Sequence, residues 1–192
     1  MKKLLILKLL IFAFVVCNAQ KQTTLPIIKR TIIDFLKWHK AGSEFENGRA
    51  YFVPRYDEKD TTKTYFDSDS LELYYNRFRK SNFVSETYIN QLKEYFSYYG
   101  KFIGPKRSPG EIVKIEGLDQ DIVLGTFEPE VILDNLSKAR ITKSLIVHRK
   151  ALLSVNFAKE VNLVFILTKQ DKTWLIDYLG PDNTSINSFF RQ

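Results

Sequence analysis

The chain has 192 residues, of which 44% are hydrophobic, 27% charged and 14% aromatic. This composition is typical of a folded globular protein and excludes disordered, collagen-like and repetitive chains. Three of the 29 basic residues lie within the first 19 positions, which leaves 26 basic and 22 acidic residues, a net charge of +4. A charge this small on a chain of this length argues against nucleic acid as a partner.

Residues 1–19 have the pattern of a secretory signal peptide. Two lysines precede an apolar run, residues 4–16, which is shorter than the roughly 20 residues that span a bilayer. Ala19 is the small residue after which we expect cleavage, so the protein should be exported, periplasmic or secreted, without stable insertion in a membrane. A lipid anchor on Cys17 is the alternative.

Cysteine chemistry is excluded from the exported chain, because Cys17 is the only cysteine and leaves with the signal peptide. Residues 20–192 can therefore form neither a disulfide nor a cysteine-ligated zinc site. No linker or repeat divides them, so we expect a single domain. We expect no cofactor, because the sequence contains no glycine-rich phosphate-binding loop.

The first helix is predicted over residues 26–42, because Pro26 suits a first helical turn and Gly42 suits a helix end. Mostly apolar residues recur along it at intervals of three or four, and the opposite side is charged. This helix should therefore bury one face. The residues of that face are Leu25, Ile28, Ile32, Phe35, Leu36 and His39.

Two further helices are predicted before residue 101. Asp69 and Glu72 resemble a capping box that opens a short helix. Ser85 suits the N-cap of a third helix, which should end at Gly100. Residues 49–56 are interpreted as an extended segment, which the proline within it confines to a sheet edge or a loop.

Extended structure dominates after residue 138. Three runs are predicted as strands, residues 139–157, 161–168 and 173–179, with breaks of hairpin length between them. Before them, residues 112–115 suggest a short strand and residues 129–136 a helical segment. Helices followed by a strand meander predict an α+β fold, with three N-terminal helices packed on a curved antiparallel β-sheet.

The two predicted hairpins also specify a register. A turn at residues 158–160 and a second turn centred on Gln170 and Asp171 place one apolar set of side chains on the same face. We expect that face to be buried and the face that carries Val164 to be partly solvated. The expected pairs are Phe157–Val161, Val155–Leu163, Leu153–Phe165, Leu167–Trp174, Phe165–Ile176 and Leu163–Tyr178.

The chain resembles a known group in two places. Trp38-His39 ends the first helix, and Asp171-Lys172-Thr173-Trp174-Leu175-Ile176-Asp177 closes the meander. These features are similar to the cone-shaped nuclear-transport-factor-2-like (cystatin-like) superfamily, and more narrowly to exported bacterial members classed as a domain of unknown function. The resemblance implies a cone-shaped fold with a cavity, but no particular reaction, because this fold hosts unrelated functions.

Trp38, His39 and Tyr178 are the residues that we expect at such a cavity. His39 is either a general base in that cavity or, as we favour, a partly buried histidine stabilised by the helix dipole. His148 is interpreted as part of a solvated bend. The sequence shows no convincing His–Asp pair, so no catalytic residue is assigned.

Two Asp-x-Asp motifs, Asp67 with Asp69 and Asp119 with Asp121, raise the question of a metal site. Calcium takes six to eight oxygen ligands, and neither motif supplies them. Helix capping explains the first motif and a surface turn the second, so we expect no metal. Nine of the ten tyrosines lie between residues 51 and 99, and we expect their rings to pack in the core.

Three functions remain open. The leading hypothesis is a non-enzymatic exported module that binds a small molecule or a protein partner. The first alternative is an isomerase, dehydratase or hydrolase that uses the cavity. The second is an envelope inhibitor or immunity-type protein. A polar cavity would favour the first two, whereas a filled core with an exposed aromatic patch would favour the last.

Overall fold

The computed structural model describes residues 24–42, 47–56, 64–103, 117–158 and 161–181. The predicted signal peptide with its expected cleavage site, the strand expected at residues 112–115 and the turn residues 159–160 lie outside the described residues. Residues 24–41 are helical and are called the sheet helix below. The other elements are α3 (Arg49–Phe52), β1 (Arg55–Tyr56), β2 (Thr64–Tyr65), α4 (Ser68–Ser81), α5 (Glu86–Ile103), α6 (Glu130–Leu133), the 3₁₀ helix η1 (Leu136–Lys138), β3 (Arg140–Val147), β4 (Lys150–Ala158), β5 (Val161–Gln170) and β6 (Thr173–Pro181).

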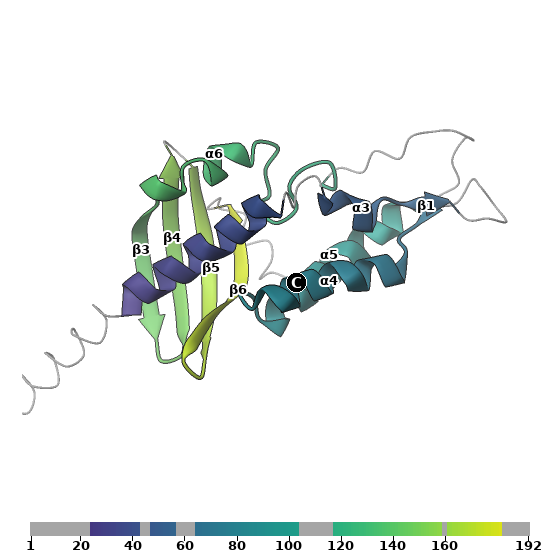
Figure 1. The fold of residues 1–192 in the computed structure, drawn as a ribbon. Coiled ribbons are helices and arrows are strands. Elements are labelled where there is room, and N and C mark those ends of the chain that lie inside the picture. Colours follow the sequence, from purple (N-terminus) through teal and green to yellow (C-terminus); the bar gives the residue numbers. More distant parts are fainter. Residues whose placement is uncertain (1–23, 43–46, 57–63, 104–116, 159–160, 182–192) are drawn as a thin grey trace, which may run out of the picture.

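The α+β class is confirmed. Strands β3, β4, β5 and β6 form a four-stranded antiparallel sheet in chain order, and the sheet helix crosses one of its faces (Figure 1). Three long helices are present as expected, but two short ones, α3 and α6, accompany them in the described chain. The segment expected to be extended at residues 49–56 is instead α3 followed by the short strand β1.

The inner face of the sheet packs against the sheet helix. Alternate residues of the strands point to this face, and those of its centre are almost completely buried. The apolar stripe of the sheet helix meets them in one hydrophobic cluster. Its main members are Ile28, Ile32, Phe35 and Leu36 from the helix and Leu153, Val155, Leu163, Phe165, Leu167 and Ile176 from the sheet.

Contrary to the prediction, helices α4 and α5 do not lie on a face of the sheet. Together with α3 and the β1–β2 pair they form a helical lobe that extends beyond β6 (Figure 1). Aromatic rings fill this lobe: the Tyr74 ring contacts those of Phe52, Phe78 and Phe96. The crowding of tyrosines in this part of the sequence is therefore explained by packing. Tyr74, Tyr75 and Tyr88 are buried, whereas Tyr65 and Tyr98 remain exposed.

The helical lobe is joined to the sheet along β6. Val84 forms a parallel bridge with Ile176. The backbone N–H of Ser85 donates to the Ile176 carbonyl at 2.9 Å, and the Ile176 N–H donates to the Phe83 carbonyl at 2.8 Å. The edge of β6 is thus covered by a segment that lies about 90 positions earlier in the chain. The opposite edge strand, β3, has no second strand beside it in the part of the chain that the structure describes.

The predicted register is correct for β4 and β5 except at the turn that joins them, and it is wrong for β5 and β6. Leu153 pairs with Phe165, and Val155 pairs with Leu163, as expected. Val161, however, pairs with Ala158 rather than with Phe157. Strand β6 is displaced because its turn contains Asp171 and Lys172, so that Gln170 pairs with Thr173. A bulge at Asp177 displaces it further. The observed pairs are Leu167–Ile176, Ile166–Tyr178, Phe165–Leu179 and Leu163–Pro181.

Tyr178 consequently lies on the outer face of the sheet, with Ile166, and not beside Leu163 on the inner face. The long run predicted over residues 139–157 is two strands, since β3 and β4 are separated by a hairpin turn at His148 and Arg149. The solvated bend expected at His148 is this turn, and its backbone φ is 51°. The outer face is only partly solvated, because Val164 is 6% exposed.

Helix boundaries differ from the expected ones by a few residues. Asp67, rather than Asp69, is the N-cap of α4, and its carboxylate accepts the N–H of Asp69 at 3.0 Å. Helix α5 continues past Gly100 to Ile103. The helical segment expected at residues 129–136 is divided into α6 and η1. No helix within the described ranges has the length and apolarity needed to cross a membrane.

Candidate functional site

A partly open hollow of about 320 Å³ lies where α6 meets the start of β5 and the end of β6. Most of its lining residues are apolar, but its exposed wall is polar and apolar in equal measure, and Glu128 supplies the charge among the described residues that line it. Thr126 and Asn162 add neutral polar groups. The remaining lining residues are Leu124, Gly125, Val131, Ile132, Val161, Leu163 and Pro181.

One wall of the hollow is the loop of residues 121–126, whose shape is dictated by Asp121. One carboxylate oxygen of Asp121, Oδ1, accepts the backbone N–H groups of Val123 and Leu124, both at 2.9 Å. The backbone of Asp121 also bonds to Thr126 and to Gly125. Gly125 has a φ of +64°, which an L side chain rarely adopts. An aspartate at the start and a glycine at the φ-positive position therefore make this tight turn.

The same aspartate is bound from behind by the sheet helix. His39 Nε2 lies 2.7 Å from Asp121 Oδ2, and each side chain is 1% exposed. Because a carboxylate only accepts, Nε2 carries the proton of this hydrogen bond. His39 Nδ1 has no hydrogen-bond partner in the described chain. The pair connects residues 82 positions apart and fixes the loop wall to the sheet helix.

The three expected cavity residues are not brought together. Trp38 is half-buried between the sheet helix and α4, with its ring 5.3 Å from that of Phe78. His39 lies near the end of the sheet helix as expected, but it is fully buried against Asp121 rather than partly buried. Tyr178 is on the outer face of the sheet, where burial raises the pKa of its hydroxyl. None of the three lines the hollow.

The His39–Asp121 pair is the feature that the sequence does not predict, since the sequence pattern places Asp121 in a surface turn. It is buried instead. A local signal was present: Asp121 stands two and three residues before the amides that it caps, as in an Asx turn. Nothing local indicates that its second oxygen would meet His39. Because both side chains are shielded from solvent and neither lines the hollow, the pair holds the structure together and is not placed to act on a substrate.

A second buried carboxylate, Asp177, ties three strands to the helical lobe. Its Oδ1 accepts the hydroxyl of Ser85 at 2.6 Å, and its Oδ2 accepts from Lys150 Nζ at 2.8 Å and from the Thr168 hydroxyl. Burial raises the pKa of Asp177, but the hydrogen bonds from Lys150, Ser85 and Thr168 and the charge of Lys150 outweigh it. The net result is a pKa below the usual 3.8, so this carboxylate is ionised and fully engaged.

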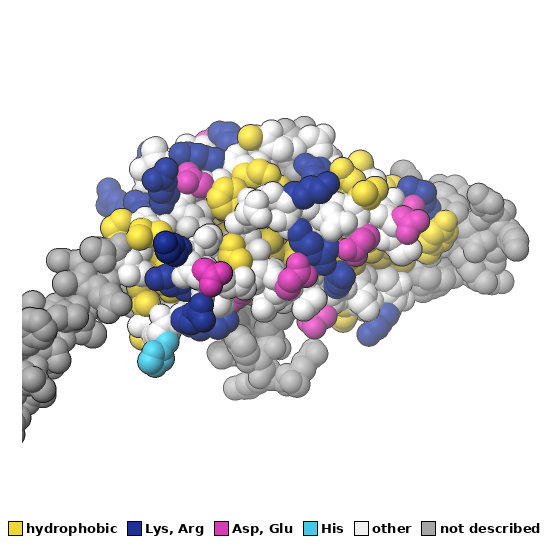
Figure 2. Space-filling model, turned by 60° about the horizontal axis from the view of Figure 1, so that its bottom comes forward, with side chains coloured by type: hydrophobic (Ala, Val, Ile, Leu, Met, Phe, Trp, Pro, Cys, Tyr) yellow, Lys and Arg dark blue, Asp and Glu magenta, His cyan; other side chains and the backbone are white. Residues whose placement is uncertain are grey.

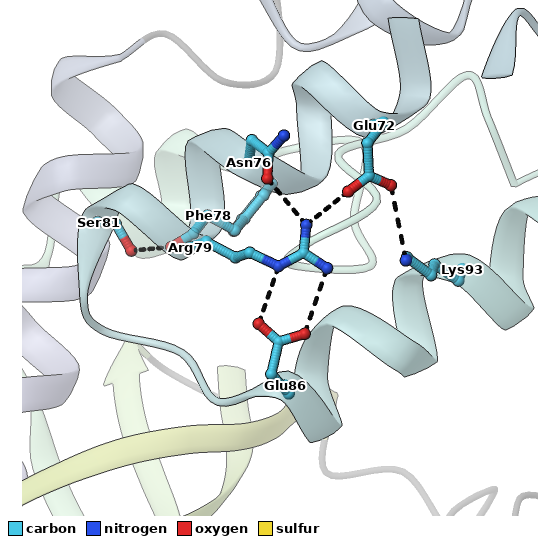
Figure 3. Close-up of polar contacts among 7 residues, drawn as sticks. All are labelled: Glu72, Asn76, Phe78, Arg79, Ser81, Glu86 and Lys93. Carbon is cyan, nitrogen blue, oxygen red and sulfur yellow. Dashed lines mark hydrogen bonds and ion pairs between the residues drawn. The ribbon is translucent and has the colours of Figure 1, made fainter. Parts of the chain in front are cut away.

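Arg79 organises the turn between α4 and α5 (Figure 3). Its guanidinium binds both oxygens of Glu86, at 2.8 and 3.2 Å, and also Glu72 at 2.7 Å and Asn76 at 2.9 Å. Hydrogen bonds from Arg79 are the main reason why the pKa values of Glu72 and Glu86 lie below their usual 4.5. All of these partners of Arg79 belong to α4 and α5, so the cluster joins the two helices and has a structural role.

The acidic motifs do not form a metal site in the described chain. Asp67 caps α4, and Asp119 accepts at its backbone carbonyl from Arg49. Within the described ranges, no three His, Cys, Asp or Glu side chains are grouped as a metal ion requires.

Comparison with known proteins finds no matching family model, no similar curated protein and no similar solved structure. The function must be inferred from the residues of this chain.

Proposed function

We propose that the chain is an exported, non-enzymatic binding module and that the hollow beside α6 is its ligand site. The cone-shaped superfamily resemblance and the signal peptide belong to this proposal and are supported by the sequence. The observation that carries it is a hollow whose wall is preorganised: the loop of residues 121–126 is held by its own hydrogen bonds and by His39. A wall that is already in place reduces the ordering cost of binding.

The lining indicates the chemistry of the ligand. Ligand pockets typically enclose about 300–1,000 Å³ and combine apolar walls with a few polar groups. A hollow of about 320 Å³ therefore suits a small molecule. Leu124, Val131 and Ile132 offer apolar contact, whereas Glu128 favours a neutral or positively charged polar group. A small compound that combines an apolar part with amine or hydroxyl groups fits this lining.

The position of the His39–Asp121 pair argues against the enzyme alternative, which would need such a pair as its general acid or base. His39 and Asp121 face one another inside the protein, and Asp121 Oδ1 is occupied by two amides. A general base must reach the proton that it removes. We therefore propose no reaction.

Native mass spectrometry of the purified chain tests the binding proposal. The chain should retain a small molecule, and Val131→Trp should abolish retention because the indole fills the hollow. Glu130→Trp is the matched control, since Glu130 is exposed on the same short helix and does not line the hollow. Equal retention by both variants, or a wild-type chain that carries no adduct and binds nothing from a set of small apolar amines and alcohols, would contradict the proposal.

A further inference from the structure

The β3–β4 hairpin is unusually basic. Residues 136–158 contain no aspartate or glutamate. Arg140 and Lys143 on β3 are exposed and pair with no acidic residue of the described chain. Figure 2 shows the wider pattern: Lys and Arg side chains gather on the half that carries the sheet, and acidic side chains are more interspersed over α4 and α5. The basic residues of the hairpin and its entry are Lys138, Arg140, Lys143, Arg149 and Lys150.

Between these charges the hairpin exposes apolar side chains. Leu145 is 58% exposed, Val147 52% and Leu152 44%. Leu145 and Leu152 are direct partners across β3 and β4, and all three residues share the outer face. Single exposed apolar residues are common on protein surfaces, but a contiguous apolar set with a charged border is typical of an interaction site.

The backbone of β3 adds an unused row of hydrogen-bonding groups. Along an antiparallel ladder, pairs that exchange backbone hydrogen bonds alternate with pairs that do not. Val147 and Lys150 close a two-residue turn, so they are of the first kind. Consistently, the carbonyl of Arg149 faces β5, where it accepts the Lys169 N–H at 2.7 Å. Ser144 and Ile146 are therefore of the second kind, and their N–H and C=O groups point away from β4.

We propose that β3 binds an extended acidic segment of another protein by strand addition. The incoming strand pairs with the backbone of Ser144 and Ile146, and its apolar side chains lie beside Leu145 and Val147. Its acidic residues are placed opposite Lys143 and Arg140. Backbone pairing supplies affinity in this mode of recognition, and alternate side chains supply specificity.

Charge decides between this partner and a second copy of the chain. Self-pairing through β3 would bring two basic strands together, with no acidic residue on either to compensate. Like charges at a strand edge oppose such pairing. The bulge between Ile141 and Lys143 also limits the regular part of β3 to residues 143–147. Because the edge of β3 is short and basic, pairing with a second copy is unfavourable. Pairing with an acidic strand of another protein is favoured by charge complementarity.

Fluorescence anisotropy with the full chain tests this proposal. The probes are labelled octapeptides in which every second position, and therefore one face of the strand, carries two acidic residues (Glu or Asp) and two apolar residues (Val, Ile or Phe), with Thr at the positions between them. Peptides with Lys in place of the acids are the control. We expect saturable binding of the acidic set alone. Ser144→Pro removes one outward N–H and should weaken binding at least tenfold, whereas Ser144→Ala should not. Lys143→Glu should weaken it similarly and serves if the proline variant does not fold.

Hydrogen exchange gives an independent readout, because the bound peptide should slow exchange at the amides of Ser144 and Ile146. Absence of saturable binding by all acidic peptides, or equal affinity for Ser144→Pro, overturns the proposal. Binding to phosphatidylglycerol vesicles that is lost in Leu145→Glu but kept in Ser144→Pro, with no peptide binding, overturns it in favour of a lipid surface. A peptide-independent dimer that Ser144→Pro dissociates overturns it in favour of self-association.

Discussion

Two links run from the end of the sheet helix to the segment around the hollow, and they differ mainly in burial. His39 binds Asp121 at 2.7 Å inside the protein. Lys40 binds Asp134 at the same distance of 2.7 Å on the surface. Breaking a buried pair leaves an unpaired polar group in a site without water, whereas an exposed pair is replaced by hydration. The two neighbouring residues thus provide an internal comparison of the same kind of contact.

Asp121→Ala should lower the free energy of unfolding by about 3–5 kcal/mol, because it leaves the buried His39 side chain without its hydrogen-bond partner and removes the cap of the 121–126 turn. Asp134→Ala, the control, should cost no more than about 1 kcal/mol. Urea unfolding at pH 7 measures both. Similar small losses would mean that the buried pair contributes little.

Asp177 makes the free energy of unfolding depend on pH in the acidic range. Because its pKa is lower in the folded protein than the usual 3.8, the unfolded chain takes up its proton first as pH falls. The stabilisation is therefore complete above about pH 5 and is lost as the pH falls through the folded pKa. We expect Asp177→Asn to be less stable than the wild type at pH 7 and to show a shallower loss between about pH 5 and pH 2. Urea midpoints across this range measure the effect, and parallel curves would refute it.

The strands could be predicted where alternation is uninterrupted, and they were misplaced where a bulge or an unusual turn intervenes. The inner face of β4 and β5 follows directly from the period of two. The turn at His148 carries no glycine or asparagine, although its backbone φ of 51° is one that those residues favour. At the bulge, the carboxylate of Asp177 accepts hydrogen bonds from Ser85, Lys150 and Thr168. The residue types at the His148 turn are not those typical of its backbone conformation, and the partners of Asp177 are distant in the sequence, so the local pattern shows neither feature.

The two faces of the sheet should respond differently to an acidic side chain. Leu163 is 2% exposed, so Leu163→Asp should cost several kcal/mol and unfold the domain. Val164 is too buried to be the tolerant partner expected from the sequence. Leu152, 44% exposed on the same outer face, replaces it as the control, and Leu152→Asp should cost about 1 kcal/mol or less. Thermal melts decide, and equal damage would show that the outer face is also covered.

For the whole molecule, composition and periodicity were enough for the class but not for the arrangement. The order of helices before strands predicts α+β, and the stripe on the sheet helix predicts which face it buries. The displacement of α4 and α5 beyond β6 could not be predicted, since their aromatic faces pack equally well on a sheet or on one another. One wall of the hollow is fixed by the His39–Asp121 contact, and a contact across 82 positions leaves no trace in a single sequence.

The parallel bridge between Val84 and Ile176 has a consequence for the order in which the fold is completed. During synthesis the helical lobe emerges early, but the strand to which it attaches emerges only near the end. Closing so long a loop costs entropy before any contact compensates, so such non-local pairings form slowly. The nascent chain therefore cannot complete its fold until β6 has been synthesised. This delay suits a protein that we propose to be translocated across a membrane before it folds.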